Sequence, residues 1–218
     1  MPTKPVMVFD LDGTLVHSVP DLHAAASKML ADEGRTPLPI DLVQSFVGNG
    51  VPKLVERVIR ATGLDAADHG RLTQAYLSHY EASPSDLSTL YPGVKDCLKD
   101  LKSAGFHLGL CTNKPQTPAI SLMQDFDLAQ YFDTIVGGDA LPVRKPDPRH
   151  LFHAFEQLGA KFGIYVGDSE TDNKTALDGS IPFAFFTGGY RKSEESEFTF
   201  EFAFDDFGKL TDWALANT

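Results

Sequence analysis

The chain has 218 residues, of which 42% are hydrophobic and 22% are charged, and its formal net charge is −11. This length allows one sizeable core, or a core with a small accessory domain. The negative charge argues against a nucleic-acid partner, because contact with a phosphate backbone needs a basic surface. No apolar run approaches the roughly 20 residues that span a membrane, and the N-terminus has no signal-peptide core. We therefore expect a cytoplasmic protein with no nucleic-acid or membrane partner.

The chain has two cysteines, Cys97 and Cys111. Two cysteines are too few for a disulfide framework, and neither has the spacing of a metal site. We interpret both as reduced, buried thiols, as is usual in the cytosol.

The first predicted element is a strand at Val6–Phe9, where four apolar residues follow one another. From about Ser18 to Ser88 the apolar residues recur at helical spacing, and this stretch contains no convincing strand. Pro52 is placed near the start of one of these helices and Gly63 near its end. The pattern predicts a small helical domain of residues 16–89, inserted directly after the first strand.

From Tyr91 onward the sequence alternates between helix and strand patterns. Strands are predicted at "FHLGLCTN", "DTIVGGD", "IYVGD" and "PFAFFTGG", each separated from the next by a helix. Such alternation indicates an α/β fold, in which a Rossmann-like, doubly wound parallel sheet carries helices on both faces. Residues 1–15 and 90–218 would form this core. Phe198–Phe204 alternates with the period of a strand, and we expect an edge strand there.

Polar side chains stand where the predicted core strands end. Because ligands bind beyond the carboxyl ends of the strands in an open α/β sheet, these side chains should gather at one edge. They are Asp10, Asp12 and Thr14 after the first strand, Thr112, Asn113 and Lys114 after the second, Lys145 in the loop after the third, and Asp168 and Asp172 after the fourth.

This set of groups suits phosphoryl transfer. Carboxylate oxygens are hard ligands that suit magnesium, and a lysine with a threonine hydroxyl suits phosphate oxygens. One carboxylate beside a bound phosphate could attack phosphorus, and a second could handle the proton of the leaving group.

Four motifs carry a family resemblance: "DLDGT", "CTN", "RKPDP" and "GDSETD", in this order along the chain. With them the chain resembles the haloacid dehalogenase superfamily of phosphohydrolases over essentially its whole length. The helical insertion resembles the small cap of that family. Within the superfamily, "FVGNGVPKLVERV", "YPGV" and "GGDALPVRKPDP" resemble phosphoglycolate phosphatases most closely.

The resemblance implies a role for each motif residue. Asp10 would be the nucleophile that forms an aspartyl-phosphate, and Asp12 would protonate the leaving alkoxide and then activate water. Thr112 and Lys145 would bind the transferred phosphoryl group, with Asn113 assigned beside them.

The resemblance also implies a Mg2+ cofactor. The ion would be held by the Asp10 side chain, the Asp12 backbone carbonyl and Asp168, with Asp172 supporting these ligands from behind. Asp172 is also typical of a carboxylate at a helix start, and the two interpretations can hold together.

The substrate is expected to be small, because a cap folded over the site leaves little room for a leaving group. Within the cap, "GNGVPKLVER" leads into a helix whose free N–H groups suit an anion. Our candidate substrate residues are Asn49, Gly50, Lys53 and Arg57, with Arg60 nearby. The best single substrate is 2-phosphoglycolate, and the protein would be a monomer or homodimer.

Alternatives remain open. A sugar-phosphate phosphatase or a phosphomutase of the same superfamily would use the same two aspartates, whereas a hydrolytic dehalogenase typically lacks the second one, Asp12. A phosphoaspartate signalling module shares the acidic cluster, but such modules are shorter and have no inserted cap.

His17 stands where the family commonly has Asp, and Asn173 where it often has an apolar residue. His150 and His153 have a spacing that can bind metal, but no third ligand is near in sequence.

Overall fold

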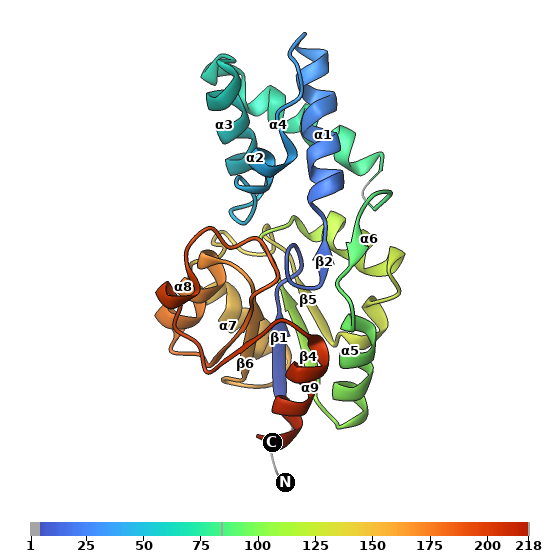
Figure 1. Ribbon diagram of the computed structural model, residues 1–218, viewed down its shortest axis with the longest axis vertical. Helices are drawn as coiled ribbons and strands as arrows, with labels where there is room; N and C mark the ends of the chain where they lie inside the picture. Colours follow the sequence, from blue (N-terminus) through green and yellow to red (C-terminus); the bar gives the residue numbers. More distant parts are fainter. Residues whose placement is uncertain (1–4, 84, 218) are drawn as a thin grey trace.

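The computed structural model describes residues 5–83 and 85–217. Its core is a six-stranded sheet in which all neighbouring strands are parallel (Figure 1). The order is β5-β4-β1-β6-β7-β8, formed by β1 (Val6–Phe9), β4 (His107–Cys111), β5 (Thr134–Val136), β6 (Ile164–Gly167), β7 (Phe183–Phe186) and β8 (Phe202–Phe204). The predicted α/β fold with a parallel sheet is confirmed.

Helices cover both faces of this sheet. One face packs against α5 (Val94–Ser103), α6 (Gln116–Asp125) and α9 (Phe207–Ala216), and the other against α7 (Pro148–Gln157) and α8 (Glu170–Gly179). In β1, Met7 and Phe9 belong to the first of these hydrophobic clusters, and Val6 and Val8 belong to the second. Burial on both faces explains the unbroken apolar run of this strand, and the sheet is doubly wound as predicted.

The segment between β1 and α5 forms four helices: α1 (Val19–Asp32), α2 (Ile40–Gln44), α3 (Val51–Thr62) and α4 (His69–Glu81). They share a hydrophobic core of their own and lie beyond one end of the sheet (Figure 1). Two short strands, β2 (Val16–His17) and β3 (Thr89–Leu90), pair antiparallel where the chain enters and leaves this group. We call α1–α4 the cap; the division into domains at residues 16 and 89 stays a prediction.

Local sequence fixes the limits of α3. Pro52 stands in its first turn, where a missing N–H costs nothing. Gly63 ends the helix with a φ of 68°, in the left-handed region that favours glycine. The longest helix, α1, has 14 residues. No helix in the described part of the chain is long and apolar enough to cross a bilayer.

The C-terminal third differs in part from the predictions. The strand predicted over Phe198–Phe204 is limited to β8, which lies at the sheet edge as expected. Phe198 and Phe200 instead pack on Phe185 of β7, with ring centroids 4.3 and 5.8 Å away. Between them, the backbone of Thr199 bonds to the Asn173 side chain and not to a strand. Helix α9 and the single turn η3 (Glu195–Glu197) were not predicted, whereas the turns η1 (Ala66–Asp68) and η2 (Ala129–Tyr131) lie within stretches that were predicted to be helical.

Candidate active site

The candidate site lies at the carboxyl ends of β1, β4 and β6, which are neighbours in the sheet. The chain continues from β4 to β5 on one side of β1 and from β6 to β7 on the other. This is the switch point at which open α/β sheets bind ligands. The structure brings to this edge the motif residues that were predicted from the sequence: Asp10, Asp12, Thr112, Asn113, Lys145, Asp168 and Asp172.

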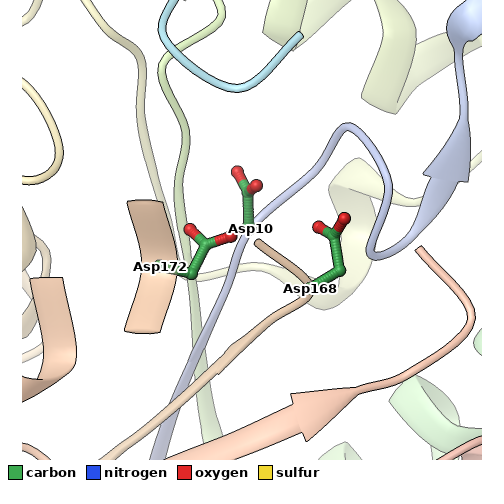
Figure 2. A group of neighbouring side chains, drawn as sticks. All are labelled: Asp10, Asp168 and Asp172. Atoms are coloured by element: carbon green, nitrogen blue, oxygen red, sulfur yellow. The ribbon is translucent and has the colours of Figure 1, made fainter. Parts of the chain in front are cut away.

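Three buried carboxylates form the floor of the site (Figure 2). Asp10 follows β1, Asp168 follows β6, and Asp172 lies in the first turn of α8. One oxygen from each lies within 4.8 Å of the others. Asp12, assigned to the metal through its backbone carbonyl, keeps its side chain outside this group.

Lys145 is the counterion of the floor. Its Nζ lies 2.9 Å from Asp10 Oδ1 and 2.7 Å from Asp172 Oδ1, and it donates to the Tyr165 hydroxyl at 2.7 Å. The Tyr165 hydroxyl in turn donates to Asp172 at 2.6 Å. Lys145 is itself buried, so its charge acts on the carboxylates with little screening by water.

Burial and mutual repulsion shift the pKa values of these groups. Burial, followed by the Asp172 charge, raises the pKa of Asp10 to about 7, although Lys145 opposes the shift. Burial and the charges of Asp172 and Asp10 raise the pKa of Asp168 well above its usual range. Burial would also raise the pKa of Asp172, but Lys145 and hydrogen bonds from Ser169 outweigh it, and the pKa is lowered. Of the three carboxylates, Asp172 is therefore held most firmly in its charged form.

The floor fits a divalent cation. Three buried carboxylates face one lysine, which leaves an excess of negative charge that is costly without a further cation. Asp10 Oδ1 is within ion-pair distance of Lys145, yet it finds no hydrogen-bond partner among the described residues. A hard cation between these oxygens would satisfy that atom and favour the ionised carboxylates.

The turn after Asp12 is shaped around Asp168. Gly13 has a φ of 93°, and a Cβ on it would collide with Asp168 Oδ2. Thr14 donates its hydroxyl to Asp168 Oδ1 at 2.8 Å, and the backbone N–H of Tyr190 donates to Oδ2 at 2.6 Å. These contacts explain why Gly and Thr follow the aspartates: the one allows close approach, and the other fixes the carboxylate.

Asp172 is a helix-start carboxylate that also contacts Lys145 in the floor of the site. Its Oδ2 accepts from the backbone N–H and the hydroxyl of Ser169, and the Ser169 hydroxyl accepts from the Asp172 N–H. This is a capping box at the start of α8. Because Oδ1 binds Lys145, the carboxylate joins the helix start to the floor of the site.

Asp12 has a partner that the sequence analysis did not assign. Lys114 Nζ lies 3.1 Å from Asp12 Oδ1 and 3.3 Å from Oδ2, and 4.6 Å from the centroid of the Tyr80 ring, which belongs to the cap. Burial lowers the pKa of Lys114, but Asp12 and Tyr80 outweigh it, and the pKa is raised. The position of Lys114 directly after "CTN" was the sequence feature that could have indicated this contact.

Thr112 and Asn113 stand between the floor and the cap. Thr112 is buried, and its hydroxyl accepts from the Lys114 N–H at 3.2 Å. Asn113 donates at 2.9 Å both to Gly48 O of the cap and to Lys145 O. Asn113 therefore ties the cap to the loop that carries Lys145.

A cavity of about 40 Å3 lies between this floor and the cap. Its core side carries the polar groups of Asp10, Asp12, Thr112, Asn113 and Lys114. Its cap side is mostly apolar, with Leu22, Val47, Val51, Leu54, Leu77 and Tyr80. The charges are therefore gathered on one side of the space in which a substrate would sit.

The cap residues proposed for substrate binding fall into two groups. Gly50 lines the cavity beside the start of α3, whereas Asn49 and Arg57 hold the loop. Asn49 donates to Thr171 of the core at 3.1 Å and accepts from Arg57, which also donates to Phe46 O. Lys53 is half-exposed and paired with Glu56, so the structure does not bring it to the cavity. Arg60 is 81% exposed.

The two histidines at metal spacing have separate surroundings. His150 is buried, with Nε2 3.0 Å from Gly137 O and Nδ1 3.5 Å from Cys111 Sγ. His153 lies on the outer side of α7 and contacts Gln157. Both cysteines are free and buried, as predicted.

The two departures from the family pattern also have partners. The ring nitrogen Nδ1 of His17 lies 3.1 Å from the Tyr190 hydroxyl. Asn173 donates to Thr199 O at 2.6 Å, which links α8 to the segment before β8.

Known proteins resemble this chain in sequence and fold. The model of the haloacid dehalogenase-like hydrolase family matches residues 7–186. The chain belongs to this family. The family resemblance inferred from the four motifs is thus confirmed.

Named relatives cover nearly the whole chain. A phosphoglycolate phosphatase of Cereibacter sphaeroides is 44% identical over 210 residues, which is 95% of this chain and 96% of that protein. One from Rhodospirillum rubrum is 40% identical over 215 residues, 95% of this chain and 89% of its own. A crystal structure described as a predicted phosphoglycolate phosphatase from Haemophilus somnus is 28% identical, with a TM-score of 0.91 over 98% of this chain and 99% of that one.

Proposed function

We propose that the chain is a magnesium-dependent phosphatase that hydrolyses a small phosphoester through an aspartyl-phosphate, with 2-phosphoglycolate as the best single substrate. The observation that carries the proposal is the division of the two aspartates of "DLDGT". Asp10 lies with Lys145 on the carboxylate floor, and Asp12 lies with Lys114 beside the cavity. The choice of substrate is supported by the relatives, which are named phosphoglycolate phosphatases.

The proposed reaction uses these residues in two steps. Asp10 attacks phosphorus; its bond to phosphorus forms as the bond to the ester oxygen breaks, and the leaving oxygen takes a proton from Asp12. The Asp12 carboxylate then takes a proton from water, which attacks phosphorus and releases inorganic phosphate and free Asp10. Lys145 and the Thr112 hydroxyl compensate the negative charge that spreads over the phosphoryl oxygens.

Magnesium is the proposed cofactor, with Asp10, Asp168 and the Asp12 backbone carbonyl as ligands and Asp172 in support. Such an ion supplies positive charge for the phosphoryl oxygens. The support is the excess of buried carboxylate on the floor and the oxygen chemistry of the donors, which suits hard cations.

The alternatives differ in what accepts the phosphoryl group. A phosphomutase passes it to a second sugar hydroxyl, and a phosphoaspartate signalling module keeps it on Asp10. The apolar cap side of the cavity offers few partners for the hydroxyls of a sugar, which favours a compact ester over a sugar phosphate. We further propose a cytoplasmic monomer or homodimer.

The test is a panel of small phosphoesters assayed with and without Mg2+. Asp10→Asn should fold normally and lower kcat by roughly three to six orders of magnitude, because the nucleophile is lost. Asp212→Asn, an exposed change on α9, is the matched control. Normal turnover by a folded Asp10→Asn protein would sink the mechanism, and a tenfold preference for sugar phosphates would replace the substrate.

A further inference from the structure

We propose that Lys114 recognises a carboxylate on the leaving group of the substrate, and so selects carboxylated phosphoesters. This inference rests on the proposed function and adds the residue that reads the part of the substrate beyond phosphorus. The cations predicted for this task, Lys53 and Arg57, lie on α3 of the cap, whereas Lys114 belongs to the core.

Lys114 is held firmly at the cavity. Its backbone N–H donates to the Thr112 hydroxyl at 3.2 Å, and its carbonyl accepts from Gly138 N–H at 2.7 Å. The side chain is 3% exposed. Of the described residues that line the cavity, Lys114 alone is cationic.

The ammonium lies where the leaving group must lie. Asp12 has to reach the ester oxygen to protonate it, and Lys114 Nζ is 3.1 Å from Asp12 Oδ1. In 2-phosphoglycolate the carboxyl carbon is two bonds from that oxygen. A carboxylate so placed is adjacent to an ammonium with three donors, and a charge-assisted hydrogen bond can form between them.

The cap strengthens this interaction. The Tyr80 ring covers the ammonium from α4, and apolar side chains of the cap line the opposite side of the cavity. Charges attract more strongly in such surroundings than in water. A neutral hydroxyl in the same position gains much less, so the gain is specific for an anion.

Two other nearby cations are engaged elsewhere. Lys145 is bound to Asp10 and Asp172 on the phosphoryl side, and Arg57 holds the cap loop. Arg144 is exposed, but its guanidinium approaches Gly50 closely enough that a Cβ there would contact it. Arg144 is therefore the competing candidate.

The kinetic test compares 2-phosphoglycolate with 2-hydroxyethyl phosphate, which carries a hydroxymethyl group in place of the carboxylate. In Lys114→Met, the ratio of the two kcat/KM values should fall tenfold or more, equivalent to about 1.4 kcal/mol. Lys114→Arg should restore part of the ratio. Lys209→Met, an exposed lysine on α9, should keep the wild-type ratio.

The ratio separates recognition from positioning. If Lys114 only orients Asp12, both esters lose kcat equally and the ratio stays constant, which overturns the proposal. A loss of the ratio in Arg144→Gln, with none in Lys114→Met, also overturns it and assigns the role to Arg144.

A binding measurement keeps this test independent of turnover. Calorimetry with phosphonoacetate and 2-hydroxyethylphosphonate should show at least tenfold weaker binding of phosphonoacetate to Lys114→Met, and a change below threefold for 2-hydroxyethylphosphonate, which lacks the carboxylate. A wild-type protein that hydrolyses neither ester would overturn the proposed function, while these affinities would still decide the role of Lys114. Equal weakening of both phosphonates would reject it.

Discussion

His150 is a buried base beneath the candidate site. Gly137 O can only accept, so Nε2 carries the proton and Nδ1 is left to accept from the Cys111 thiol. Burial raises the pKa of Cys111 to about 12, which keeps that thiol protonated. His150 thus joins α7 to β4 and to the loop after β5, next to the strand end that carries Thr112.

This burial makes stability depend on pH. Burial lowers the pKa of His150 from 6.5 to about 4. Between these pH values the unfolded state binds more protons than the folded state. The contribution of His150 to the free energy of unfolding is therefore lost as pH falls from about 6.5 to 4. The full difference is on the order of 3 kcal/mol.

We expect that His150→Gln, which can still donate to Gly137 O, makes the free energy of unfolding depend less on pH between 4 and 6.5. The measurement is urea unfolding at several pH values between 4 and 7. His153→Gln, an outward-facing change on the same helix, is the control and should follow the wild type. The same pH dependence of the free energy of unfolding in wild type and His150→Gln would contradict the prediction.

Single residues differ in how far the sequence revealed them. Asp10, Asp12, Thr112 and Asp168 were found because each lies within three residues of the end of a core strand, and parallel strands end at the same edge. The same rule placed Lys114 at that edge but did not pair it with Asp12, which lies 102 positions earlier in the chain. Side-chain partners across the sheet depend on rotamers and packing, which a sequence pattern does not specify.

At the scale of elements, the start of α1 is held by a residue far along the chain. The N-cap residue, Ser18, makes no side-chain cap bond. The Tyr190 hydroxyl instead accepts from Ser18 N–H at 2.8 Å and from Val19 N–H at 3.2 Å. Since Tyr190 N–H binds Asp168, one residue connects the floor of the site to the entrance of the cap.

Tyr190→Phe should therefore loosen this entrance and leave the ring packing in place. Two buried N–H groups lose their acceptor, and we expect a loss of about 1–3 kcal/mol in the free energy of unfolding. Exchange of the Ser18 and Val19 amides should become faster. Tyr131→Phe, in the half-buried turn η2, is the control. Unchanged exchange at both amides would show that Tyr190 does not cap α1.

The elements themselves were largely predictable, but their orientations were not. The spacing of Leu54, Val55 and Val58 correctly indicated α3, and Gly63 its end. The sequence did not reveal that Lys53 lies away from the cavity, because the apolar face of a helix does not specify which neighbour covers it. The segment before β8 was assigned wrongly because the backbone of Thr199 bonds to the Asn173 side chain and not to a strand.

At the scale of the whole molecule, the carboxylate floor should make stability depend on a divalent cation. A cation that binds only the folded state at a hundred times its Kd adds about 2.7 kcal/mol, which corresponds to roughly 5–10 °C in Tm for a chain of this size. We expect Mg2+ to raise Tm by this amount, measured by calorimetry at constant ionic strength. Asp168→Asn should remove the shift, and Asp212→Asn should retain it. Equal shifts in both variants would mean that the ion binds elsewhere.

The cavity also implies movement of the cap. A volume of about 40 Å3 holds a few water molecules, whereas ligand pockets usually measure about 300–1,000 Å3. Asn49 and Asn113 each hold the cap loop against the core by a hydrogen bond. We therefore expect entry of a phosphoester to involve opening of these contacts and rotation of the cap about the strand pair β2–β3.

We expect this opening to be visible in hydrogen exchange. Phosphonoacetate with Mg2+ should increase protection near residues 16–18 and 89–93, where β2 and β3 join the cap to the core, because a bound ligand favours the closed arrangement. Thr171→Val removes the acceptor of Asn49 on the core side and should lower protection of the 46–50 loop in the free protein. Thr211→Val, a buried change of the same kind on α9, is the control. Identical exchange at both joints with and without ligand would show that the cap does not act as a lid.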